Sequence, residues 1–314
     1  MKISLKAPLS WGAIRRRARE YAASGKTLDV MSDIVFKILF TADDEDSREA
    51  LRLLLSDCTH RAIRNMQIQN NEILPEYLTG KTVRLDIHAT FNDGEQADLE
   101  MQIQKSDDDL KARALLLGAK LLAGQLKRGV KYRETKRVYQ IFFLNCILFP
   151  GSNKVPRRYF AMEEDEHDRL SPNLEIILYE MPKLEKVVRA YFEGKADLKN
   201  LSKEQKWCIF FRYKNNERME PLIQELCKQE EGIMRADRAL ARISRDQQKW
   251  ARAFSREVGI IDHESGLYAA RKVGEKAGEE RAHMEIARNL KVMGDTPEKI
   301  AAATGLSPEE IEKL

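Results

Sequence analysis

The sequence predicts an α/β fold in which a mixed central sheet is flanked by helices and followed by a helical C-terminal region. Apolar and polar residues alternate over residues 83–91 and again over 97–104, as in two half-buried strands. Residues 138–149 are almost continuously apolar, which is typical of a central strand buried on both faces. Segments with helical spacing precede and follow these strands, so helices are expected to cover the sheet.

The first helix is predicted between Ser32 and Asp57, where apolar residues recur at helical spacing. Ser32 or Asp33 is the expected N-cap, because a short polar side chain accepts a hydrogen bond from the first turn. The acidic residues 43–46 interrupt the pattern. A further strand is expected around residues 66–73.

The two alternating strands are joined by Asn92-Asp93-Gly94, a strong turn signal. A three-residue loop favours a type I turn followed by a left-handed residue, and Gly94 adopts that conformation at low steric cost. Phe91 then pairs with Glu95. The sequence therefore predicts an antiparallel hairpin of known register.

Counting back along this hairpin brings Asp86 directly opposite Glu100, with Cβ atoms roughly 4.5–5.5 Å apart. Gln102 projects from the same face of the second strand. Two carboxylates so close repel each other unless a cation lies between them. Oxygen ligands favour a hard divalent ion such as Mg²⁺ or Mn²⁺, and an ion with open positions suits phosphodiester hydrolysis. The alternative is a polar strand face exposed to solvent, although the surrounding helices favour a covered face.

After the hairpin, residues 107–128 have the spacing of a helix, and Gly129 stands where a C-cap is expected. Residues 174–181 are a further strand candidate, and the pattern is helical from residue 184 almost to the end. Four regions follow from these patterns: a basic N-terminal arm (1–27), the α/β domain (28–192), a helical region (193–265), and a hinge with a small helical tail (266–314). In the tail, Ser307, Pro308 and Glu310 form a helix N-terminal signature.

Five stretches match the pattern of one known family: KTVRLDI (81–87) with LEMQ (99–102), DIVFKILF (33–40), Arg113, QLKRGVKY (125–132), and the tail segment 300–307. Together they resemble the recombination-promoting nucleases, which are also classed as transposases of the PD-(D/E)XK superfamily. The resemblance covers about residues 28–192 and the tail.

This resemblance implies a restriction-endonuclease-like αβββαβ core and a metal-dependent nuclease. Asp86 and Glu100 would be the metal-binding carboxylates, and the main-chain carbonyl of Met101 a further ligand. Gln102 would stand where the wider superfamily has lysine. Glutamine donates and accepts hydrogen bonds but adds no positive charge. Asp33 is either an outer acidic residue near the metal or only an N-cap.

Other polar residues are weaker candidates. Arg113 and Gln125 lie on the helix after the hairpin and are expected to line a DNA-facing surface. His88 flanks Asp86 and is either a general base or a hydrogen-bond partner. Over residues 233–256, basic side chains step by three and four opposite an apolar seam, which suits either a DNA-contacting helix or a solvated face. The arginines of this stripe proposed for DNA contact are Arg235, Arg238, Arg242 and Arg245.

Composition and motifs exclude several classes. No apolar run reaches the roughly 18 residues that a membrane helix needs. The sequence has no GxxxxGK[ST] loop, so no nucleotide cofactor is expected, and no His/Cys set has zinc spacing. The four cysteines are scattered, as expected for free thiols in a cytoplasmic protein. Net charge is only +4, but the first 26 residues hold seven basic side chains and one acidic one, which suits a DNA-binding arm or a solubilising tail.

The sequence-based hypothesis is a Mg²⁺-dependent endonuclease for double-stranded DNA with low sequence specificity, linked to recombination or mobile elements. One alternative is a DNA-binding or regulatory protein whose nuclease centre is weak or silent. Another is a toxin-like or phage-defence nuclease with the same site. A homodimer is expected because cutting both strands needs two centres.

Overall fold

The structure is a computed structural model that describes residues 20, 23–69, 72–73, 83–84, 86–102, 109–126, 131–246 and 281–312. The chain divides into two compact units, residues 1–253 and residues 254–314. No helix in these described ranges is long and apolar enough to cross a membrane. All four cysteines are free, as predicted, and Cys58 and Cys208 are fully buried.

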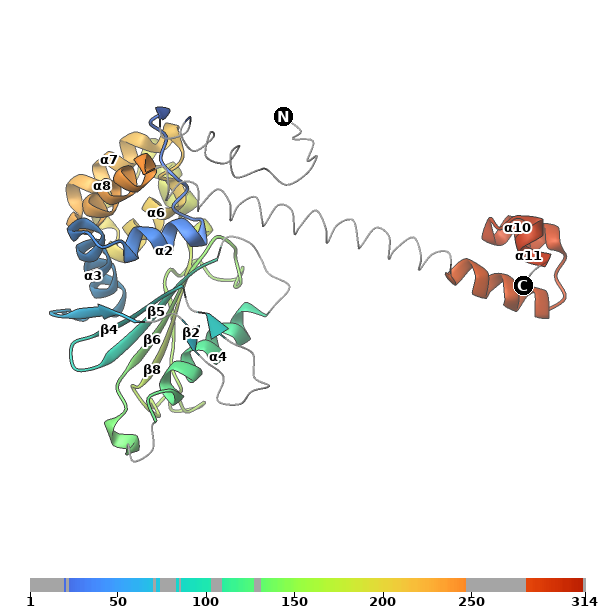
Figure 1. Cartoon of the computed structure of the whole chain (residues 1–314), viewed down its shortest axis with the longest axis horizontal. Coiled ribbons are helices and arrows are strands. Elements are labelled where there is room, and N and C mark those ends of the chain that lie inside the picture. Colours follow the sequence, from blue (N-terminus) through green and yellow to red (C-terminus); the bar gives the residue numbers. More distant parts are fainter. Residues whose placement is uncertain are drawn as a thin grey trace. The chain divides into compact units, whose positions relative to one another are not determined.

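The first unit contains six strands in one sheet, a two-stranded sheet, and helices on both faces of the large sheet (Figure 1). The strands are β1 (Met66–Ile68), β2 (Glu72–Ile73), β3 (Val83–Arg84), β4 (Ile87–Phe91), β5 (Glu95–Gln102), β6 (Val138–Leu144), β7 (Arg157–Tyr159) and β8 (Leu174–Glu180). The helices are α2 (Asp33–Thr41), α3 (Glu45–Thr59), α4 (Leu110–Ala123), α5 (Glu185–Phe192), α6 (Lys203–Tyr213), α7 (Glu220–Gln229) and α8 (Glu231–Arg245).

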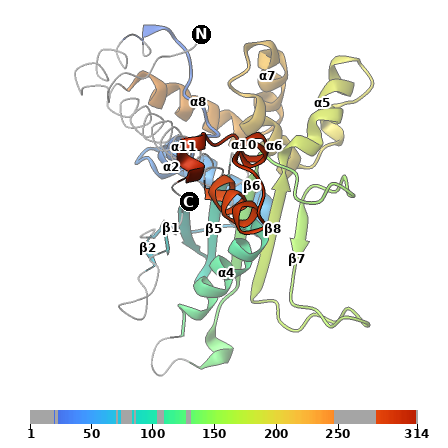
Figure 2. The same cartoon turned by 90° about the vertical axis from the view of Figure 1, so that its right-hand side faces the viewer.

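The large sheet has the strand order β1-β4-β5-β6-β8-β7 (Figure 2). Its central pairs, β5 with β6 and β6 with β8, are parallel. The pairs towards both edges are antiparallel. The sheet is therefore mixed, as predicted, and the carboxyl ends of β5, β6 and β8 meet at one edge.

The β4–β5 hairpin has the predicted register, with Phe91 opposite Glu95. Gly94 has a φ of 99°, in the region that favours glycine. The predicted type I turn is wrong, because Asn92 also has a positive φ of 49°. The Asn92 amide group explains this: its Nδ2 donates to the Ala62 carbonyl, and its Oδ1 accepts from the main-chain nitrogen of Arg64, both at 3.1 Å.

Helix α4 covers one face of the sheet over β6 and β8. Asp109 caps its N-terminus by accepting from the main-chain nitrogens of Lys111 and Ala112. The apolar contact joins one stripe of the helix to one face of β6 and β8: Leu110, Ala114, Leu117 and Leu121 against Val138, Phe142, Leu144 and Leu178. This cluster fixes the position of α4 over the sheet.

The opposite face of the sheet packs against α2, which in turn contacts α3 and α8 (Figure 1). Its core is aromatic: the ring of Phe143 on β6 lies 6.1 Å from Phe36 of α2 and 5.0 Å from Phe211 of α6. Trp207 is buried beside them at 5.6 Å from Phe211. The seam predicted on α8 is buried at Ile233, Ala236, Leu240 and Ile243. The rest of the seam and of the basic stripe, residues 247–256, lies outside the described residues.

Several predicted boundaries change. The strand expected at 83–91 is two strands, β3 and β4, in different sheets, and Asp86 lies in the bend before β4. The strand expected at 138–149 ends at Leu144, because the Glu180 carboxylate accepts from the main-chain nitrogens of Leu148 and Phe149 and folds that segment into a loop.

The helix expected at 107–128 is α4 and ends at Ala123. Its C-cap is Gly124 rather than Gly129, which lies outside the described residues. Strand β7 was not predicted, since it is only three residues long. The helical interruption predicted at residues 43–46 is found as the break between α2 and α3.

In the second unit, residues 281–292 are helical and are followed by α10 (Pro297–Thr304) and α11 (Pro308–Glu312). Ala287, Ile300 and Ile311 form its small core. The predicted N-terminal signature is confirmed: the main-chain nitrogen of Ser307 donates to Glu310 Oε2 at 2.9 Å, and that of Glu310 to Ser307 Oγ at 3.3 Å. The predicted hinge at residues 266–278 and the basic residues of 1–19 lie outside the described residues.

Candidate active site

The β4–β5 register brings the two candidate carboxylates together. Ile87 lies opposite Leu99, so the next residue back, Asp86, falls beside Glu100. The main-chain nitrogen of Asp86 donates to Glu100 Oε1 at 3.0 Å. In return, the main-chain nitrogen of Met101 donates to Asp86 Oδ2 at 3.1 Å. The backbone therefore orients both carboxylates before any ligand arrives.

Burial changes the protonation of both groups. Glu100 is only 2% exposed. Burial is the main cause that raises the pKa of Asp86 to about 6, with repulsion from Asp33 adding to it. Burial, followed by repulsion from Asp86, raises the pKa of Glu100 to about 7. Negative charge at this site is thus poorly compensated by the protein alone.

Arg113, proposed from the sequence for a DNA-facing surface, contacts the candidate site directly. Its Nη2 donates to Glu100 Oε2 at 2.7 Å, and its Nη1 to Gln102 Oε1 at 3.4 Å. Its positive charge lowers the pKa of both Asp86 and Glu100. Arg113 is therefore part of the candidate site, where it links the first turn of α4 to β5.

The main-chain carbonyl of Met101 is directed to the β4 side of β5, where Asp86 lies. Peptide groups of successive strand residues point alternately to the two neighbouring strands. The Gln102 carbonyl accepts from Asn145 at 2.9 Å, on the β6 side. The Met101 nitrogen donates to Asp86, on the β4 side, so the Met101 carbonyl is directed to the β4 side as well.

Two buried polar residues beneath the carboxylates were missed by the sequence analysis. Asp98 and Gln140 are fully buried on the same sheet face as Glu100, and Gln140 Nε2 donates to Asp98 Oδ2 at 2.5 Å. Burial, and then repulsion from Glu100, raises the pKa of Asp98 well above its ordinary range. The available signal was Gln140, the one amide in the otherwise apolar run of β6.

The candidate site fits a hard divalent ion by its donor set. Asp86, Glu100 and the Met101 carbonyl offer only oxygen atoms, which Mg²⁺ and Mn²⁺ prefer. Burial, and then repulsion from neighbouring acidic groups, raises the pKa of both carboxyl groups, and a bound cation would favour their ionised forms. Among the described residues, no group of three or more His, Cys, Asp or Glu side chains is arranged to hold a metal. Any metal at this site therefore depends on two carboxylates and a carbonyl.

Asp33 and His88 both lie near the two carboxylates. Asp33 is the first residue of α2 and its Oδ1 accepts from the Ile34 nitrogen at 2.7 Å; the N-cap is Ser32. Its negative charge acts on Asp86, so it lies within electrostatic range of the site. His88 lies opposite Asp98, two residues further along the hairpin than Asp86 and towards its turn.

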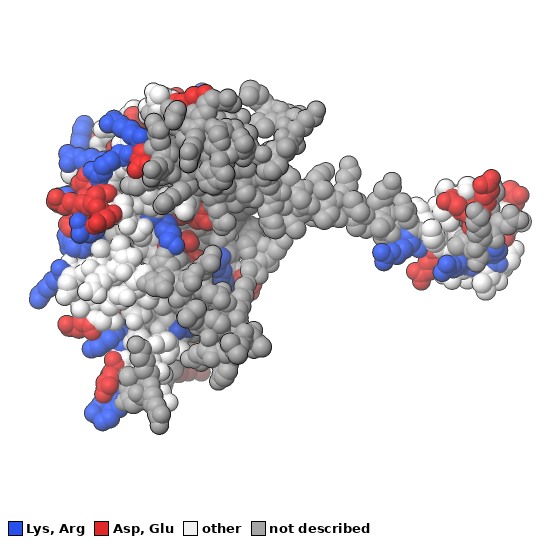
Figure 3. Space-filling model, viewed as in Figure 1, with Lys and Arg blue, Asp and Glu red and all other residues white. Residues whose placement is uncertain are grey.

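The other candidate DNA contacts are spread over the first unit. The Gln125 amide is bonded to the main chain of Lys136, to its carbonyl at 3.1 Å and its nitrogen at 2.7 Å. On α8, Arg235 and Arg242 form ion pairs with Asp46 and Asp44 at the start of α3. Basic and acidic areas adjoin on the described surface of the first unit (Figure 3). Arg238 and Arg245 are exposed.

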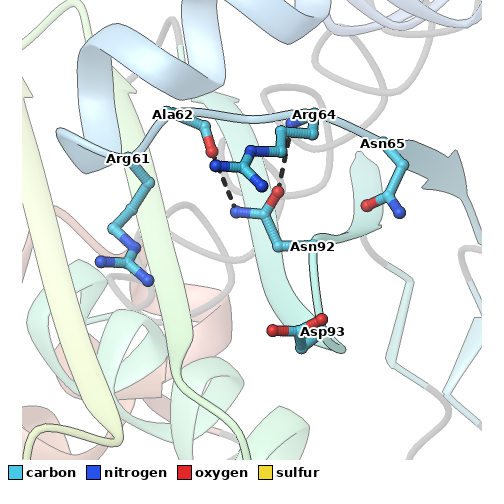
Figure 4. Close-up of a pocket in the computed structure, with 6 residues that line it drawn as sticks. All are labelled: Arg61, Ala62, Arg64, Asn65, Asn92 and Asp93. Atoms are coloured by element: carbon cyan, nitrogen blue, oxygen red, sulfur yellow. Dashed lines mark hydrogen bonds between the residues drawn. The ribbon is translucent and has the colours of Figure 1, made fainter.

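A separate cavity of about 480 Å³ lies at the turn end of the hairpin (Figure 4). Arg61 and Arg64 line it together with Asn92 and Asp93. Glu95, at this end of β5, is five residues from Glu100, or roughly 17 Å along a strand. The cavity is therefore not part of the carboxylate site.

A sequence model of the PD-(D/E)XK nuclease family transposases matches residues 30–270, which include every residue of the candidate site. The chain belongs to this family. No curated protein and no solved structure gives a significant match. The mixed sheet with flanking helices is consistent with the PD-(D/E)XK fold. The segment Glu100-Met101-Gln102 resembles the (D/E)XK pattern of the family name, with glutamine instead of lysine at its last position.

Membership in the PD-(D/E)XK nuclease family transposases links the chain to nucleases with DNA as their substrate and to mobile elements. Nucleases of this superfamily generally use divalent metals. The resemblance first recognised in the motifs around Asp86 and Glu100 is therefore confirmed at the level of family and fold.

Proposed function

We propose that this protein is a Mg²⁺- or Mn²⁺-dependent endonuclease that hydrolyses phosphodiester bonds of double-stranded DNA with low sequence specificity, in recombination or the movement of mobile elements. The observation that supports this most is the close pair of the half-buried Asp86 and the buried Glu100, each of which accepts a main-chain hydrogen bond from the other's side of the hairpin. A site of this kind is preorganised for a cation and a phosphate.

Asp86, Glu100 and the Met101 carbonyl are the residues that would hold the ion. When bound, a divalent ion lowers the pKa of a water and offsets the charge that develops on the phosphate. Gln102, on the same face, donates and accepts hydrogen bonds and is suited to orient that water. The Asp86 and Met101 nitrogens keep both carboxylates in place during the reaction.

DNA contact is proposed for basic side chains on the sheet face that holds Glu100. Across the sheet, Glu100, Phe142, Leu178 and Arg157 lie in one row, so Arg157 is three strand spacings, or about 14 Å, from Glu100. Arg157 and Lys111 lie over the Phe149 ring, with 4.4 and 4.7 Å to its centroid. Within the described residues neither cation has a carboxylate partner, so both suit phosphate oxygens.

Arg238 and Arg245, which are exposed on α8, remain proposed DNA contacts on a second surface of the protein. Arg235 and Arg242 are weaker candidates, because their acidic partners on α3 already compensate their charge. We also propose a homodimer, since cutting both strands needs two centres. Light scattering of the protein with and without duplex DNA measures this directly.

One observation favours a second function, a DNA-binding protein with a weak or silent nuclease centre. Position 102 is a neutral glutamine, and Arg113 occupies one oxygen of Glu100. A toxin-like or phage-defence role would use the same residues and is separated only by cellular context.

The proposed function is tested by incubating supercoiled plasmid with the purified protein in Mg²⁺, Mn²⁺ or EDTA. We expect nicked or linear product with either ion, no product in EDTA, and none with Asp86→Ala. Cleavage that persists in Asp86→Ala would place the reaction elsewhere. Binding of DNA without cleavage by the wild type would support the silent-centre function.

A further inference from the structure

Arg113 contacts two residues near the C-terminal end of β5, Glu100 and Gln102. The side chain leaves the first turn of α4 and reaches Glu100 Oε2 with one guanidinium nitrogen and Gln102 Oε1 with the other. Its side chain is 35% exposed, whereas that of Glu100 is 3% exposed. The guanidinium therefore bridges the buried carboxylate and the more open amide.

Arg113 hydrogen-bonds both Glu100 and Gln102, while the charge of Lys37 on α2 also acts on Asp86. The family name places a lysine two residues after the acidic residue, and this chain has Gln102 there. A neutral amide at position 102 leaves the buried Glu100 without a cation at that position of β5. The fold brings the guanidinium of Arg113 to this position from α4.

We propose that Arg113 is a positioning residue that delivers from α4 the fixed positive charge which lysine would supply from position 102, acting through Glu100 and Gln102. This proposal rests on the proposed nuclease function. On this proposal, the site needs a positive charge at this position, whichever residue carries it. It also explains how a neutral Gln102 is compatible with activity.

A purely structural role for Arg113 is less consistent with the packing. Helix α4 is already held by an apolar cluster that joins Leu110, Ala114, Leu117 and Leu121 to β6 and β8. A single buried ion pair adds little net stability, because desolvation offsets most of its attraction. The hydrogen bonds of Arg113 are therefore better explained by the positive charge they bring to the site and by the orientation they give to Glu100 and Gln102.

The test uses four proteins besides the wild type: Arg113→Gln, Gln102→Lys, the double variant with both changes, and Arg113→Lys. The control is Arg52→Gln, since Arg52 also pairs with a carboxylate, Glu49, and is similarly exposed at 32%. Two quantities are measured: single-turnover cleavage of a labelled duplex, and Mn²⁺ affinity by calorimetry without DNA. Cooperative thermal unfolding checks that each variant is folded.

We expect Arg113→Gln to slow cleavage about 100-fold, in the range seen when one preorganised charge-stabilising donor is removed. Gln102→Lys in that background should restore at least about tenfold, since it returns the charge. Arg113→Lys should retain most activity, and Arg52→Gln should stay within about twofold of the wild type.

Mn²⁺ affinity should follow net charge even if no variant cleaves DNA. Arg113→Gln should bind Mn²⁺ more tightly than the wild type, Gln102→Lys more weakly, and the double variant close to the wild type. Weaker Mn²⁺ binding by Arg113→Gln would overturn the proposal, because it would mean that Arg113 only holds the ligands in shape. Wild-type activity in Arg113→Gln, or no recovery in the double variant, would also overturn it. Absence of wild-type cleavage would instead contradict the proposed function.

Discussion

At the scale of single residues, the direction of the pKa shift separates the acidic groups of this protein into two kinds. Burial and repulsion raise the pKa of Asp86, Asp98 and Glu100, which stand together on one sheet face. By contrast, the hydrogen bond from Arg52 lowers the pKa of Glu49 on the surface of α3. A cluster of raised pKa values in one place is typical of a functional site.

Metal binding should stabilise the fold through these carboxylates. At about 100 times its dissociation constant, Mn²⁺ is expected to add about 2.7 kcal/mol to the free energy of unfolding. The increase should be lost in Asp86→Asn, which removes one ligand charge and keeps the side-chain shape. Thermal unfolding with and without Mn²⁺ measures this, and Asp57→Asn is the control. An equal shift in Asp86→Asn would show that the ion binds elsewhere.

A second residue-scale prediction concerns Asp57 of α3, whose Oδ2 accepts from Trp207 Nε1 at 3.0 Å. Burial raises the pKa of Asp57, so the folded protein binds this proton more tightly than the unfolded chain does. Stability is thus lost as pH rises from about 4, the unfolded value, through the folded pKa. Asp57→Asn should gain stability relative to the wild type as pH rises from 3 to about 7.

Urea unfolding across this pH range measures the effect. Glu49→Gln is the matched control of opposite sign: the pKa of Glu49 is lowered, so its contribution is present above the unfolded pKa and lost as pH falls. That variant should lose stability relative to the wild type as pH rises. The account of Asp57 fails if both variants change in the same direction.

At the scale of elements, two helix glycines allow close packing. A Cβ on Gly232 of α8 would lie 2.7 Å from Trp207 Cζ2 and 3.0 Å from Leu53 Cβ, while one on Gly118 of α4 would meet the movable end of Leu174 at 2.8 Å. Both glycines occupy helices in which alanine would otherwise be favoured by about 1 kcal/mol. Packing therefore overrides helix propensity at Gly232.

Gly232→Ala should destabilise the fold by about 1–3 kcal/mol, because the indole ring and the Leu53 Cβ cannot move aside easily. Gly118→Ala should cost less, since the end of the Leu174 side chain can rotate away. Chemical denaturation of the two variants gives the comparison. A stability gain for Gly232→Ala would mean that α3 and α8 are less tightly packed than the structure indicates.

The sequence predicted the parts of the fold that depend on local patterns. Alternation and the turn at Asn92-Asp93-Gly94 were sufficient for the hairpin register, and hence for the approach of Asp86 to Glu100. Arg113 was placed on the correct helix, but its contact with Glu100 depends on how α4 crosses the sheet, which has no local signal. The early end of β6 depends on Glu180, 32 residues beyond Leu148.

At the scale of the whole molecule, the candidate site and the proposed DNA contacts come from distant segments. The hairpin contributes the carboxylates, α4 contributes Arg113 and Lys111, and β7 contributes Arg157. This arrangement supports a DNA path across the carboxyl-terminal edge of the parallel strands. The family model spans residues 30–270, which extends beyond the sheet and α4 and past the described part of the first unit.

Duplex binding should therefore depend on Lys111 and Arg157. The double variant Lys111→Gln with Arg157→Gln should bind DNA more weakly, and the slope of log affinity against log salt should fall by about 2, one for each phosphate contact. Fluorescence anisotropy in Ca²⁺ measures binding without relying on cleavage. Arg189→Gln on α5 is the control, and an unchanged salt slope in the double variant would place the DNA on another surface.

The most direct test of the central claim compares two buried glutamates of the same sheet. Glu100 on β5 and Glu175 on β8 are both nearly inaccessible, and each pairs with an arginine at 2.7 Å, but only Glu100 lies beside Asp86. The measurement is single-turnover cleavage of a duplex in Mg²⁺ by Glu100→Gln and Glu175→Gln. The account predicts that Glu100→Gln cleaves at least about 100-fold more slowly, which equals or exceeds the loss seen when a residue that supports a metal ligand is removed. It predicts near wild-type cleavage for Glu175→Gln. Wild-type cleavage by folded Glu100→Gln would contradict it.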